Sequence, residues 1–133
     1  MVEKTIQGLK EKKEAMEEFL KLSAELRDVE EELKDWKELA ENEPVDAFYT
    51  GNIILKKEEM NQLKNEVLRC RAVILSAINN IADKRIRVIL RRRYINGQNV
   101  VDIARSMHYS LRHVKRLHRK GLEIINFSEK MSP

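Results

Sequence analysis

Apolar residues follow two long heptad stripes, and this spacing constrains the fold more than any other feature of the chain. The first stripe steps by three and four along Phe19, Leu22, Leu26, Val29, Leu33, Trp36 and Ala40. The second repeats these steps along Met60, Leu63, Val67, Cys70, Ile74, Ala77 and Ile81. Such stripes are typical of coiled-coil seams. They predict an all-α protein whose residues 1–80 form a helical hairpin or coiled-coil arm.

A break separates the two stripes. Pro44 is expected to end the first helix, because its ring clashes with the preceding turn and disfavours a helical backbone in the residue before it. We therefore predict a loop over about residues 42–52, in which Phe48 and Tyr49 pack against the end of the helix pair. A long, thin pair of helices leaves one side exposed. A second copy of the chain is the expected partner, in a homodimer or higher oligomer.

Charge is distributed unevenly along the 133 residues. Residues 1–47 contain eight Lys and Arg against fifteen Asp and Glu. Residues 81–133 contain thirteen against four, which is a balance of +9. A basic segment of this size is expected to contact a polyanion. Charge alone equally allows a solvated basic surface, so the positions of the cations must decide between the two interpretations.

The sequence lacks the residues that several classes of protein need for their function. The four Gly stand far apart and form no phosphate-binding loop, and the lone Cys70 provides neither a disulfide nor a cysteine zinc site. His108, His113 and His118 are spaced by five, which turns them away from a common metal ion. No segment has the roughly 20 apolar residues of a membrane span, and no signal-peptide core is present. We expect a cytoplasmic protein that is not an enzyme and that uses no cofactor.

Residues 81–133 are predicted to form a separate domain. Asp83 is placed to cap its first helix and Asn96-Gly97 to end it. One face of this helix is apolar and carries Ile86, Ile89, Leu90 and Tyr94. We expect that face to pack against the helices that follow.

A helix-turn-helix is predicted next. A short apolar helix over residues 100–107 leads to a turn, and Ser110 is placed to cap a third helix over residues 111–125. The apolar side of the third helix holds Val114, Leu117, Gly121 and Ile125. Roughly opposite lie Arg112, Lys115, Arg116 and Arg119, with no acidic residue before Glu123. A basic stripe of this kind suits the major groove, where Arg and Lys reach guanine acceptors and phosphates.

Residues 81–125 resemble the sigma-70 region 4 helix-turn-helix. More narrowly, they are similar to small region-4-like transcription regulators of Gram-positive phages, the late-gene activators of the ArpU-like kind. The likeness is carried by Arg91 to Gly97 (RRRYING), Ile103-Ala104, Met107, Tyr109-Ser110, Val114 and Arg116-Leu117-His118. It implies a DNA-binding transcription regulator of phage or prophage origin that acts in the cytoplasm of a bacterial host cell. Double-stranded DNA is its implied partner, together with RNA polymerase.

The resemblance also implies which residues contact DNA. The base-reading positions fall on Leu111, Arg112, Lys115 and Arg116. Contacts to the DNA backbone are expected from Lys84, Arg85, Arg87, Arg91, Arg92, Ser110, His113, Arg119 and Lys120. His108 stands where many helix-turn-helix proteins have glycine, which predicts a left-handed backbone at this residue.

Two other functions are compatible with these residues. Region 4 of sigma factors also docks on RNA polymerase, so the domain could serve as an interaction module for polymerase or a sigma factor. That function predicts that the surface around Tyr94 and Ile95 makes the contact. A phage DNA-packaging recognition subunit, of the small terminase type, also joins a helix-turn-helix to an oligomerising arm, although usually in the reverse order.

Overall fold

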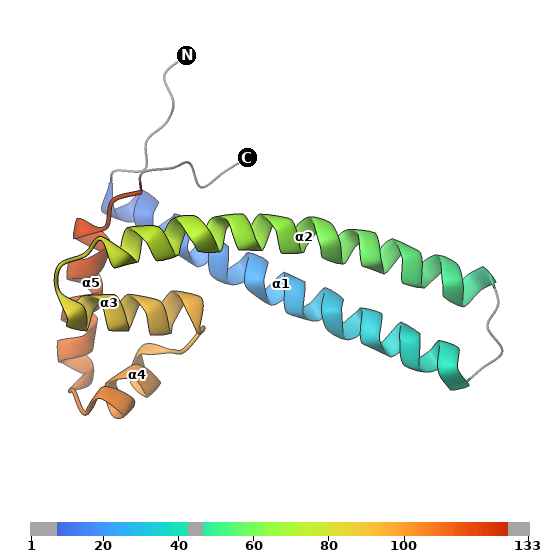
Figure 1. Ribbon diagram of the computed structural model, residues 1–133. Helices are drawn as coiled ribbons and strands as arrows, with labels where there is room; N and C mark the ends of the chain where they lie inside the picture. The colour runs from blue at the N-terminus through green and yellow to red at the C-terminus, as the bar shows by residue number, and fades with distance from the viewer. Residues whose placement is uncertain (1–7, 43–46, 128–133) are drawn as a thin grey trace, which may run out of the picture. The chain divides into compact units, whose positions relative to one another are not determined.

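The computed structural model describes residues 8–42 and 47–127, and the regular structure of those residues is entirely helical (Figure 1). The predicted all-α class is therefore confirmed. Two long helices come first, α1 over Leu9–Asn42 and α2 over Ala47–Asn79. Four shorter segments follow: α3 over Lys84–Leu90, the π-helix η1 over Arg91–Ile95, α4 over Val100–Met107 and α5 over Leu111–Ile124.

The contacts of the chain divide it into two compact units. One, here called the arm unit, comprises the described residues among 21–69. The other, here called the basic unit, comprises the described residues up to 20 and from 70 onward. Each long helix therefore contributes to both units. The boundary predicted between residues 80 and 81 lies inside the basic unit, because ends of α1 and α2 supply core residues such as Met16 and Ile74, both fully buried.

In the arm unit, the predicted stripes form the less exposed side of both helices. The most buried members of the stripes there are Val29, Leu33 and Val67. The Lys56 ammonium of α2 lies 3.0 Å from Oε2 of Glu32 on α1 and 3.1 Å from Oε2 of Glu59. Hydrogen bonds to these two carboxylates, the one to Glu32 foremost, raise the pKa of Lys56. The two helices are therefore in contact through this ion pair.

The connection between the long helices differs from the prediction. Residues expected in the loop but found in the first turns of α2 are Phe48, Tyr49, Gly51 and Asn52. The rings of Phe48 and Tyr49 pack edge-on against Trp36 of α1, with centroid separations of 5.6 and 6.2 Å. The packing of these rings against the end of the helix pair was predicted, but the two residues lie in a helix instead of a loop. The predicted break at Pro44 lies outside the described residues.

In the basic unit, each helix after α2 that begins at a turn has a side-chain cap. The Asp83 carboxylate accepts a hydrogen bond from the N–H of Arg85 at 2.9 Å, and the Ser110 hydroxyl accepts one from the N–H of His113 at 3.1 Å. Both caps were predicted. Asn99 caps α4 in the same way, at 2.8 Å, and its own sequence signal is an amide side chain just before an apolar helix.

Helix α5 packs against both α3 and α4. The buried residues that these helices contribute include Ile86, Ile89, Leu90, Ile103, Val114, Leu117 and Leu122. Gly121 allows a close approach, because a Cβ at this position would lie 2.8 Å from Cγ2 of Ile86 and 3.0 Å from Cδ1 of Leu90. This packing fixes which face of α5 points to solvent.

Candidate nucleic-acid interface

The turn between α4 and α5 has the conformation that its sequence predicts. His108 adopts left-handed backbone angles, with φ 58° and ψ 37°. The N–H of Tyr109 donates to the carbonyl of Ala104 at 3.0 Å and that of His108 to Arg105 at 3.3 Å, which satisfies carbonyls at the end of α4. Ser110 then starts α5. Three residues therefore redirect the chain from one helix into the next.

The outer face of α5 is basic along the helix from its first turns. Its exposed cations are Arg112, Lys115, Arg116, Arg119 and Lys120. Their steps of three and one place them on one stripe, while Val114, Leu117, Gly121 and Leu122 are buried on the other side. Leu111, the remaining predicted base-reading residue, is 38% exposed at the start of the helix. The structure thus presents all four predicted base-reading residues to solvent on α5.

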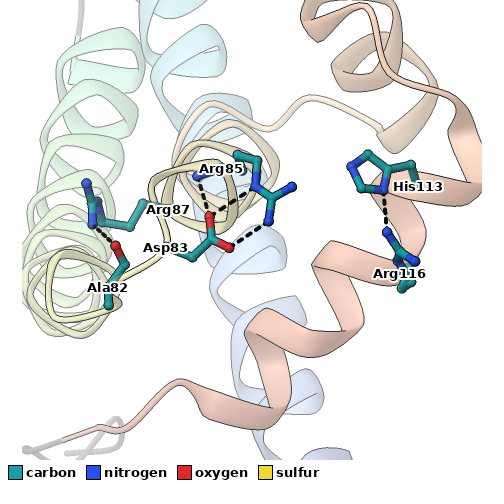
Figure 2. Close-up of polar contacts among 6 residues, drawn as sticks. All are labelled: Ala82, Asp83, Arg85, Arg87, His113 and Arg116. Atoms are coloured by element: carbon teal, nitrogen blue, oxygen red, sulfur yellow. Dashed lines mark hydrogen bonds and ion pairs between the residues drawn. The ribbon is translucent and has the colours of Figure 1, made fainter.

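The cations of this stripe differ in what holds them. Within the part of the chain that the structure describes, no ion pair or side-chain hydrogen bond engages Arg112, Lys115 or Lys120. Arg119 pairs with Glu123, Nε to Oε1, at 3.3 Å. Arg116 donates from Nη2 to Nδ1 of His113 at 2.8 Å (Figure 2).

Tyr109 connects the turn to this stripe. Its ring packs edge-on against His113, with a centroid separation of 4.9 Å and an interplanar angle of 67°. Arg85 lies at the start of α3. Arg85 forms an ion pair with Asp83, Nη2 to Oδ2, at 3.0 Å, and this partner holds the pKa of Asp83 below its usual value.

Two other residues predicted to contact the DNA backbone have hydrogen-bond partners within the protein. Arg87 donates from Nη1 to the main-chain carbonyls of Ile81, at 2.6 Å, and Ala82, at 3.0 Å, which follow the end of α2 (Figure 2). Arg92 donates to the hydroxyl of Ser106 on α4. These two guanidinium groups join neighbouring segments of the basic unit through hydrogen bonds. Lys84 and Arg91 are exposed and form no ion pair with another described residue.

A partly buried polar pair beneath the stripe was not predicted. The Tyr94 hydroxyl and Nε2 of His118 are hydrogen-bonded at 2.7 Å, and the two rings stack at 5.6 Å. Burial raises the pKa of Tyr94 to about 12, against a smaller lowering by Arg93. Burial also lowers the pKa of His118, and Arg93 lowers it further. Tyr94 is 2% exposed and Ile95 is half-buried, so Tyr94 itself contributes little to the surface around these two residues. No sequence signal joins residues as far apart as Tyr94 and His118.

No group of three or more metal-ligating side chains occurs in residues 8–42 and 47–127. None of the helices described in those ranges has the length and apolar character needed to cross a membrane.

Comparisons with known proteins identify a family. A family model described as Protein of unknown function (DUF1492) matches residues 39–126. The matched segment contains α2 to α5 and therefore the whole basic stripe. No curated protein and no solved structure is significantly similar to the chain.

Proposed function

This chain belongs to the DUF1492 family, whose function is unknown, and we propose that it is a sequence-specific DNA-binding regulator of transcription. In this proposal α4, residues 108–110 and α5 form a helix-turn-helix, and α5 enters the major groove. The long helices form a hairpin arm through which two copies associate. The resemblance of residues 81–125 to phage regulators extends the proposal to a phage or prophage protein in a bacterial host cell.

The observation that carries the proposal is the one-sided charge of α5. Five exposed cations share its outer face, and the single acidic residue of α5 is Glu123, near its end. An ordinary solvated helix mixes both signs, as α1 does with residues such as Lys34 and Asp35. A duplex offers phosphates and guanine acceptors to such a face.

The proposed roles follow from the resemblance to sigma-70 region 4. Arg112, Lys115 and Arg116 reach base edges, with Leu111 contacting a base through its apolar side chain. Lys84, Arg91, Arg119 and Lys120 contact phosphates. Arg85 and Ser110, which take part in the caps of α3 and α5, also contact phosphates.

Exposed apolar residues support a second copy as a partner. In the arm unit, the large apolar side chains that are at least 47% exposed include Leu39, Ile54, Leu55 and Leu68. Ile54 and Leu55 are neighbours on α2, and contiguous exposed apolar side chains mark interaction sites. A single helix-turn-helix buries little surface on DNA, so two copies also fit the affinity that a specific regulator needs.

RNA polymerase is a second proposed partner. Val101 on α4 is 48% exposed, and Ile124 at the end of α5 is 47% exposed. Both are outside the basic stripe. If they contact polymerase, Val101→Lys abolishes activation of a reporter gene while DNA binding stays unchanged.

Selection of bound duplexes from a random DNA pool at near-physiological salt tests the main proposal. The wild type should enrich one motif, and the triple variant Arg112/Lys115/Arg116→Ala should enrich none, because each lost base contact costs about 1–3 kcal/mol. The matched control removes three exposed cations from α2, as Lys57/Lys64/Arg69→Ala. This control has the same net charge as the triple variant and should select the wild-type motif. Equal selection by both variants, or no motif with the wild type, would refute the proposal.

A further inference from the structure

We propose that Arg116 recognises a guanine and that His113 is the residue that positions it. The inference rests on the proposed function, and it gives His113 a different role from the phosphate contact expected from its sequence. It names both the base that the site recognises and the side chain that sets this preference.

The geometry singles out Arg116 among the proposed base-reading residues. Its Nη2 lies 2.8 Å from Nδ1 of His113, one turn earlier on α5. No side-chain partner holds Arg112 or Lys115 among the described residues. A guanidinium that is already held in one orientation loses fewer rotamers when it binds a base. Arg116 is thus the best pre-oriented of the three.

His113 is itself held in place. Its main-chain N–H bonds to the Ser110 hydroxyl at 3.1 Å, and its ring packs against Tyr109 with centroids 4.9 Å apart. The side chain is half-buried, whereas Arg116 is exposed. A restrained residue therefore holds the exposed guanidinium of Arg116.

Hydrogen-bond chemistry determines which atom of the Arg116–His113 pair donates and which accepts. Arg116 has donors alone, so Nδ1 of His113 must be the acceptor, and the ring proton of the neutral imidazole lies on Nε2. A guanidinium has five N–H groups. After one is used by His113, Nη1 and Nη2 each retain at least one N–H. Those two can donate side by side to O6 and N7 of guanine, the commonest specific contact of arginine in the major groove.

Two substitutions of His113 separate positioning from packing. His113→Phe retains an aromatic ring against Tyr109 but has no acceptor. His113→Asn places a carbonyl oxygen close to the position of Nδ1 and restores the acceptor. Thermal melting of each variant shows that it is folded before binding is compared.

The experiment measures binding to duplexes in which each position of the selected motif is changed in turn. We expect Arg116→Ala to reduce the preference for guanine at one position by about tenfold or more. His113→Phe should reduce the preference at that same position by about fivefold, with affinity for random DNA within about twofold of the wild type. His113→Asn should recover most of the preference. The double variant His113→Phe/Arg116→Ala should have the same guanine preference at this position as Arg116→Ala alone.

The outcomes distinguish this inference from the proposed function. If the wild type selects a motif and His113→Phe retains the full guanine preference, His113 has no positioning role and the proposed function stands. If His113→Phe weakens binding to cognate and random DNA equally, His113 contacts phosphate and the inference is wrong. If the wild type selects no motif, both the proposed function and this inference fail.

Discussion

The Lys12 ammonium donates a hydrogen bond to the main-chain carbonyl of Glu123 at 3.0 Å. Lys12 is in the first turns of α1, and Glu123 is in the last turn of α5. The lysine is 8% exposed, so most of its surface is covered by the basic unit. Carbonyls at the end of a helix carry partial negative charge and usually lack a helical partner. The start of α1 therefore caps the helix that we propose enters DNA.

Replacing Lys12 tests whether this cap stabilises the basic unit. Lys12→Ala should lower the free energy of unfolding by about 1–3 kcal/mol, because a charged hydrogen bond and a packed side-chain stem are lost. Lys10→Ala is the control, since Lys10 is exposed on the same helix and should change stability by less than about 0.5 kcal/mol. Urea denaturation measures both. Equal effects of the two substitutions would show that the contact adds nothing.

Replacing Gly121 or Gly51 with alanine is expected to change the stability of the fold in opposite directions. An alanine at position 121 places Cβ 2.8 Å from the branched side chain of Ile86, so Gly121→Ala should destabilise the fold by about 1–3 kcal/mol. No atom lies within 4 Å of a Cβ at position 51 of α2. Gly51→Ala should stabilise by about 0.5–1 kcal/mol through helix propensity alone. A stabilising Gly121→Ala would contradict the close packing of α5 on α3.

The left-handed residue in the turn gives a third prediction. His108→Gly should stabilise the protein by up to about 1 kcal/mol, because glycine adopts a φ of 58° without the Cβ clash. His108→Val should destabilise it by about 1 kcal/mol or more, since a β-branched side chain is disfavoured there. The denaturation midpoint should be above that of the wild type for His108→Gly and below it for His108→Val. The reverse order would mean that the turn changes conformation.

The pair of Tyr94 and His118 predicts how stability depends on pH. The pKa of His118 is lowered by burial first and then by Arg93 and Lys13, against an opposing effect of Glu17. The unfolded chain then takes up a proton near pH 6.5 that the folded chain binds at lower pH. Stability should therefore fall as pH decreases below about 6.5. His118→Gln should show a smaller decrease between pH 7.5 and 5.5.

Tyr94 makes the stability of the fold depend on pH in the alkaline range. Its folded pKa of about 12 exceeds the ordinary value near 10, so the stabilising contribution of the neutral hydroxyl is lost between about pH 10 and 12. Tyr94→Phe should remove this loss. If either variant has the pH profile of the wild type, the corresponding group does not control stability.

Much of the fold was predictable from the chain because local rules determine it. The heptad stripes, the caps Asp83 and Ser110, and the left-handed His108 each depend on a few neighbouring residues and their backbone preferences. The same reasoning correctly separated the buried and basic faces of α5. Whether those cations bind DNA is a prediction that the binding experiments address.

Contacts between distant residues were decided by the tertiary structure alone. Phe48 lies in α2 with its ring against Trp36, and Arg87 is held at the carbonyls that follow α2. Lys12 and Glu123 are 111 positions apart, so no periodic pattern could pair them. Sequence determined which local conformations and faces form, because these follow from neighbouring residues. Tertiary packing decided which polar groups meet, because a buried donor takes whichever acceptor the folded chain brings within reach.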